Sequence, residues 1–259
     1  MSFFSEIFGI ANPESVIFVD ISAGSVAGAY AHYKKDEAPS LLYTRRLPIE
    51  IRDGEPHERA MLRALEILGS TLIREGAPSL MRATGHGRAD RIFVSIDAPW
   101  QHTSVRTERL QQKTPFVFTK NMVTSVMEKT RTASSGKFLA DESITGTILN
   151  GYEIRSPYGK KAHNAEMLIL TSFINAQVAS EIRTLLQNLY HAEHISFIAG
   201  NSLRCQMMLK VFPHEHDVLI LDAVGSIASI ALVRKGLLVA VIEASSTLEV
   251  GSWAERIGS

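Results

Sequence analysis

The hydrophobic positions of the chain form short runs that are separated by turn residues. Runs of this length, rich in valine, isoleucine and leucine, are typical of buried strands. In chain order, the runs predict strands at 16–19, 25–33, 41–47, 91–96, 102–109, 144–155, 165–173, 194–199, 218–221 and 239–242.

Other stretches repeat their hydrophobic residues every three or four positions, as amphipathic helices do. Met61, Leu65, Leu68 and Leu72 predict a helix at 57–75, which Gly76 and Pro78 are expected to end, leaving 77–90 as a loop. Because strands and helices alternate, with both hairpins and helical crossovers, the chain is predicted to be an α/β protein with mixed sheets. Further helices are predicted from Thr119 to about 132, around 178–189, at 202–210 and at 248–257.

Composition narrows the class of protein. The 259 residues suffice for one large or two ordinary domains, and the 45% hydrophobic content supports a sizeable core. Lys and Arg total 27, as do Asp and Glu, so bulk electrostatic binding to nucleic acid is not expected. The single cysteine, Cys205, excludes an intramolecular disulfide and a cysteine-based zinc cluster, which fits a reducing, cytoplasmic setting. No apolar run is long enough to predict a spanning helix.

One motif occurs twice. Asp20 ends an apolar run and is followed by Gly24-Ser25, and Asp222 ends another and is followed by Gly225-Ser226. Each copy reads as a strand, an acid at its end, a glycine turn and a returning strand. A carboxylate beside open backbone N–H groups can hold a phosphate together with a cation. The repeat therefore predicts a duplicated fold with a nucleotide between its halves.

The two hairpins resemble the phosphate motifs of the actin-like ATPases, whose fold is ribonuclease H-like with mixed sheets. The order of parts is most similar to the bacterial division protein FtsA and the pilus assembly protein PilM, which insert a small strand-helix-strand-strand domain between the two motifs. By this resemblance, residues 1–90 form the first subdomain and residues 91–172 the inserted α+β domain. Residues 173–259 complete the first half and begin the second, and the C-terminal part of the family fold is expected to be missing.

The resemblance also implies a site for ATP and Mg²⁺. Asp20 and Asp222 would orient the hydrated cation, and no catalytic residue is assigned. The pattern departs from the family at Val224 and Ser226, where glycines are usual, and at Ser229, where a second acid is usual. A Cβ obstructs close approach of a phosphate to the backbone, so ATP hydrolysis is left open. The implied phosphate contacts are Ser22, Ala23, Gly24, Ser25, Gly225 and Ser226.

Three functions stay open at this point. An FtsA-like scaffold of bacterial cell division would polymerise or recruit partners in response to nucleotide. A PilM-like protein would act in assembly of a type IV pilus or secretion apparatus, with a degenerate nucleotide site. A sugar or metabolite kinase of the same superfamily would need a catalytic base, and none is evident. The first two imply partner proteins of a division or pilus complex, self-association, and a cytoplasmic place at the inner face of the membrane.

The start of the chain bears on membrane contact. Phe3, Phe4, Ile7 and Phe8 would share one face of a short helix. That face either docks on the core or makes a peripheral contact with a membrane or a partner.

Overall fold

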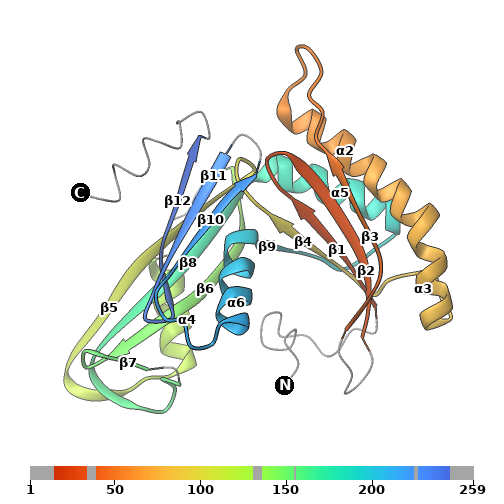
Figure 1. Ribbon diagram of the computed structural model, residues 1–259. Coiled ribbons are helices and arrows are strands. Elements are labelled where there is room, and N and C mark those ends of the chain that lie inside the picture. Colours follow the sequence, from red (N-terminus) through yellow and green to blue (C-terminus); the bar gives the residue numbers. More distant parts are fainter. Residues whose placement is uncertain (1–14, 34–38, 131–135, 155, 225–226, 246–259) are drawn as a thin grey trace. The chain divides into compact units, whose positions relative to one another are not determined.

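The computed structural model describes residues 15–33, 39–130, 136–154, 156–224 and 227–245, which belong to two compact units (Figure 1). The first comprises the described parts of Met1–Trp100, Ala176–Gly200 and Val224–Ile227, and the second those of Gln101–Asn175, Asn201–Ala223 and Ala228–Ser259. The helices predicted at the start and end of the chain lie outside the described residues. Among the described helices, none is long and apolar enough to cross a membrane.

The first unit is built on a five-stranded sheet with the order β3-β2-β1-β4-β9. Its first three strands run antiparallel, and the last two lie parallel to β1. The strand predicted at 91–96 therefore belongs to this unit rather than to the insert, where the sequence division placed it. The rest of that three-part division stays a prediction. The strands are β1 (Ser15–Ile21), β2 (Ser25–His32), β3 (Ser40–Pro48), β4 (Arg91–Ile96) and β9 (Ile195–Ala199).

Helix α2 (His57–Thr71) covers one face of this sheet through the predicted stripe, whose last residue, Leu72, directly follows the helix; all four residues are fully buried. A Cβ on Gly28 of β2 would lie 2.5 Å from the Leu72 side chain, so the helix approaches the sheet where the strand lacks a side chain. Helix α5 (Ala176–Tyr190) packs on α2 in the same way, with Leu189 against Gly69. The missing side chains of both glycines thus set the spacing of the layers.

The prediction of a loop at 77–90 was wrong over its first half, which is helical. A π-helical turn, η1 (Leu72–Gly76), leads directly into helix α3 (Ala77–Thr84). Pro78 does not break the helix because it occupies the first turn of α3, where its missing N–H has no partner to lose. Gly76 serves packing instead, since a Cβ there would lie 2.7 Å from the Tyr30 ring. Gly85, with φ of 81°, ends α3 in the left-handed conformation.

The buried Tyr30 gives the first unit a predicted sensitivity to alkali. Burial raises the pKa of Tyr30 from 10.0 to about 12. Between these pH values the unfolded chain loses a proton that the folded chain keeps, so the free energy of unfolding falls as pH rises. We expect a loss of roughly 2 kcal/mol across this window. Urea unfolding at pH 9 to 12 measures it, and Tyr30→Phe should flatten the dependence; an unchanged slope in that variant contradicts the prediction.

The second unit contains a four-stranded sheet in the order β5-β8-β6-β7, with neighbouring strands antiparallel. Helix α4 (Lys120–Thr130) packs on it, and the Thr119 hydroxyl accepts a hydrogen bond from the Met122 amide at 3.3 Å, as the predicted N-cap requires. Phe116, Phe118 and Met167 lie in the core between them. The strands are β5 (Gln101–Val117), β6 (Lys137–Leu149), β7 (Tyr152–Glu153) and β8 (Lys161–Asn175).

The same unit holds a three-stranded sheet in the order β10-β11-β12. Leu170 of β8 shares a hydrophobic cluster with Ala231 and Val233 of this sheet and with Cys205 of helix α6. Cys205 is buried, as the sequence predicted, and burial raises the pKa of its thiol to about 11. The elements are α6 (Gly200–Val211), β10 (Val218–Val224), β11 (Ile227–Arg234) and β12 (Leu237–Ser245).

Candidate functional site

The first predicted phosphate hairpin is formed by β1, β2 and the turn between them. Asp20 lies next to the end of β1 and pairs across the sheet with Ala27 of β2, which in turn pairs with Arg46 of β3. Residues in one such row point to the same face of a sheet. The small side chain of Ala27 leaves room for Arg46 to reach over β2 toward the acid.

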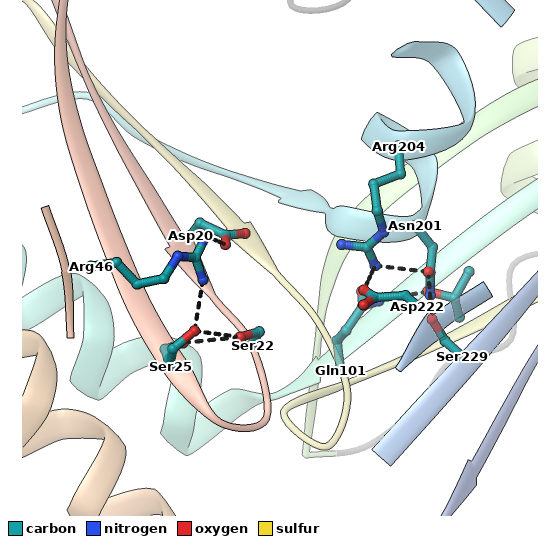
Figure 2. Close-up of polar contacts among 10 residues, drawn as sticks. Asp20, Ser22, Ser25, Arg46, Gln101, Asn201, Arg204, Asp222 and Ser229 are labelled. Atoms are coloured by element: carbon teal, nitrogen blue, oxygen red, sulfur yellow. Dashed lines mark hydrogen bonds and ion pairs between the residues drawn. The ribbon is translucent and has the colours of Figure 1, made fainter. Parts of the chain in front are cut away.

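Arg46 joins the acid to the hairpin turn (Figure 2). One terminal nitrogen of its guanidinium lies 3.3 Å from a carboxylate oxygen of Asp20, and the other donates to the Ser25 hydroxyl at 2.7 Å. The Ser22 hydroxyl is 3.1 Å from that of Ser25 and from its carbonyl oxygen. The side chains of Arg46 and Asp20 are 58% and 36% exposed, so solvent screens the ion pair and it adds little to stability.

The carbonyl groups of the turn are held from three other parts of the first unit. The indole N–H of Trp100 donates to the carbonyl of Ser22 at 3.3 Å, and His57 lies 3.2 Å from the carbonyl of Ala23. The Ile49 amide donates to the carbonyl of Gly24 at 2.9 Å. These contacts fix the turn before any ligand arrives.

The second predicted acid has a similar partner. Asp222 of β10 forms an ion pair with Arg204 of α6, with 3.1 Å between nitrogen and oxygen (Figure 2). The same terminal nitrogen of Arg204 donates to the side-chain oxygen of Asn201 at 2.9 Å. Ser229 of β11 donates its hydroxyl to that oxygen as well, at 3.1 Å. Ser229 stands where the resemblance implies a second acid, and here its hydroxyl contacts the Asn201 amide.

The second unit contains buried polar atoms that lack a hydrogen-bond partner among the described residues. They include the side-chain nitrogen of Asn201 and the side-chain oxygen of Gln101, in residues that are each 3% exposed. Buried polar atoms in folded proteins nearly always find a partner, so an unsatisfied one points to water or to a ligand atom. Asn201 therefore joins Asp222 as a candidate ligand-facing residue.

The structure brings together five of the predicted site residues, Asp20, Ser22, Ala23, Gly24 and Ser25, in one hairpin. It places Asp222 in the second unit, and Gly225 and Ser226 lie outside the described residues. Sequence reasoning missed both arginines and Asn201. Arg46 could have been found from the sequence, because the correct hairpin registers place it in the same row as Asp20. Arg204 and Asn201 offered no such signal, since only tertiary packing of α6 brings them to β10.

The side chains around Asp20 and Asp222 decide whether the protein can hold the predicted Mg²⁺ directly. In the described part of the chain, no three His, Cys, Asp or Glu side chains are grouped so as to hold a metal ion. Mg²⁺ requires carboxylate or phosphate oxygens around it, with several waters retained. Beside Asp20 and Asp222, however, the structure places a guanidinium, so these acids do not fit a cation held by the protein in this arrangement. Binding of Mg²⁺ through water stays a prediction.

Comparison with solved structures identifies the fold. The chain matches the structure titled PilM-PilN type IV pilus biogenesis complex with a TM-score of 0.53 at 14% identity, over 94% of this chain and 64% of that one. The chain therefore shares the fold of that structure, which is the actin-like fold that the resemblance to PilM implied. This confirms the predicted fold class and the structural resemblance to PilM; the resemblance to FtsA stays a prediction. The match covers 64% of the length of that chain, slightly less than two thirds.

Weaker matches have lower TM-scores. An actin-like ATPase fold protein of unknown function from Bacteroides thetaiotaomicron matches with a TM-score of 0.44 at 9% identity, over 99% of this chain and 77% of that one. The Ppx/GppA phosphatase of Aquifex aeolicus matches with a TM-score of 0.41 at 9% identity, over 93% and 55%. No protein-family model and no curated protein matches the sequence.

Proposed function

We propose that this chain is an actin-fold scaffold that recruits partner proteins and holds ATP without efficient turnover. The actin-like fold supports the scaffold role, since the matching PilM structure is a complex with PilN. PilM-like assembly of a pilus or secretion apparatus and FtsA-like action in cell division are both instances of this role. We place the PilM-like form first because the PilM-PilN structure matches with a TM-score of 0.53, higher than those of the other two structures described above.

The observation that carries the loss of turnover is the contact of Ser229. Where the family's pattern has a second acid, this chain has a hydroxyl that donates to the Asn201 oxygen. A serine hydroxyl cannot accept a proton from attacking water at neutral pH as a carboxylate can, and it cannot help to hold a cation by charge. Hydrolysis therefore lacks a group that the family pattern supplies.

Phosphate release at millimolar Mg-ATP tests the catalytic part of the proposal. We expect the wild-type chain to release no phosphate above the buffer rate, while ATP raises its melting temperature in proportion to the logarithm of its concentration. Turnover that disappears in Asp20→Ala would contradict the proposal, because it would show a working active site. Ser229→Asp serves as the matched variant, since it restores the family's acid at the same position.

The scaffold part is tested by binding to purified PilN and to division proteins in parallel. Saturable binding to PilN, with none to division proteins, supports the PilM-like role, and the reverse pattern supports the FtsA-like role. Absence of binding to either set contradicts the scaffold proposal. No contact among the described residues specifically favours the kinase hypothesis.

A further inference from the structure

We propose that Arg46, rather than Mg²⁺, supplies the positive charge for a phosphate group at the first hairpin. The ligand class is a nucleotide or polyphosphate anion that binds without a divalent cation. The inference rests on the proposed function, because it concerns how the same hairpin holds ATP.

Arg46 is positioned to meet a phosphate group at the hairpin. Its two terminal nitrogens bridge the Asp20 carboxylate and the Ser25 hydroxyl, which are the acid and the hydroxyl assigned to the cation and the phosphate. A guanidinium has five N–H donors in a planar fork that matches phosphate oxygens. The structure thus places a phosphate-binding group beside the turn, and the Arg46 side chain remains 58% exposed to an incoming ligand.

The charge around Asp20 favours an anion over a cation. Asp20 and Arg46 together carry no net charge, so the carboxylate attracts a cation only weakly while the arginine stays beside it. A hydrated Mg²⁺ at the acid would also be repelled by the guanidinium. A phosphate meets the opposite situation, because it can share the guanidinium with Asp20 or replace it as the partner of Arg46.

The second unit repeats the arrangement independently. Asp222, the other acid assigned to the cation, also pairs with an arginine, and Arg204 contacts the Asn201 amide oxygen as Arg46 contacts the Ser25 hydroxyl. Each of the two acids that the sequence assigned to Mg²⁺ therefore has a guanidinium beside it. A single such pair is an ordinary surface contact, whereas two at the two assigned acids form a pattern.

Equilibrium binding of ATP with Mg²⁺ and with excess EDTA tests the inference on the full chain. We expect removal of Mg²⁺ to change the dissociation constant by less than about threefold. Arg46→Ala should weaken binding at least about tenfold in EDTA, the effect of losing a charged hydrogen bond, and Arg46→Lys should restore part of it. Arg45→Ala is the matched control: it removes the same charge one residue earlier, on the opposite face of β3, and should leave binding unchanged.

Asp20→Asn separates the two forms of recognition by the sign of its effect. If Arg46 holds the phosphate, loss of the competing carboxylate leaves binding unchanged or tighter, in Mg²⁺ as well as in EDTA. If a cation at Asp20 holds it, the same change weakens binding in Mg²⁺. Circular dichroism checks that each variant is folded, and Arg46→Gln replaces Arg46→Ala if the latter is not.

The outcomes distinguish this inference from the proposed function. Binding that requires Mg²⁺, or an Arg46→Ala variant that binds as well as the Arg45→Ala control, overturns the role of Arg46 and leaves the scaffold that holds ATP intact. Failure of the wild-type chain to bind ATP in either condition overturns both the inference and the ATP part of the proposed function.

Discussion

Replacing Leu68 by alanine should lower the free energy of unfolding of the first unit by about 3 kcal/mol. Leu68 lies in α2, is fully buried, and packs over Gly28 of β2, where a Cβ would come within 3.4 Å of its methyl group. The substitution loses the burial of the removed atoms and leaves a cavity between two layers that glycine has already brought close. The surrounding strand has no side chain there with which to fill it.

Hydrogen exchange measures this effect without assuming that the two units unfold together. Amides of β1 and β2 should lose about two decades of protection, which corresponds to 3 kcal/mol. Ile67→Ala is the matched control, since Ile67 is the preceding residue of the same helix and is 51% exposed. It should cost less than about 1 kcal/mol. Equal losses for both variants would contradict the orientation of α2.

Much of the fold could be predicted because its signals are local. The stripe of α2 and the run of β1 are periodic patterns, and each is visible without tertiary information. The prediction failed at 77–90 because Gly76 and Pro78 usually mark the end of a helix. Here both have a second use, one as a packing site for Tyr30 and the other in the first turn of α3. A local pattern does not distinguish these uses.

The candidate site shows the same limit. The repeated acid and glycine turn are adjacent in sequence, so the hairpin around Asp20 was predicted from the chain alone. The groups that change its chemistry come from elsewhere, Arg46 from another strand and Arg204 from α6. A departure such as Ser229 could be noticed in the sequence, but its contact with Asn201 could not. The sequence therefore predicted the position of the acids better than their partners.

Replacing Gly200 by alanine should also destabilise the first unit, by about 3 kcal/mol. A Cβ at Gly200 would lie 2.3 Å and 2.5 Å from the two carboxylate oxygens of Asp97, far inside van der Waals contact. Asp97 is only 7% exposed and follows β4, and its amide donates to the carbonyl of Ile21 at 2.9 Å. The carboxylate is buried and so has little room to move aside, and any shift of the Asp97 backbone would disturb the end of β1, directly before the hairpin turn. Overpacking of this kind costs 1–3 kcal/mol, and displacing a buried carboxylate adds to that cost, so we place the effect at roughly the top of the range.

Urea unfolding of Gly200→Ala, with hydrogen exchange in β1 and β4, measures the cost. Gly87→Ala is the matched control, because the nearest atom to a Cβ there is 3.9 Å away and the substitution should be nearly neutral. The double variant with Asp97→Ala decides the cause. If the carboxylate is the obstacle, Gly200→Ala should cost much less in the Asp97→Ala background than in the wild type. Full additivity of the two substitutions would mean that Gly200 is needed for another reason. The contact between Gly200 and Asp97 would then contribute nothing to the stability of the hairpin.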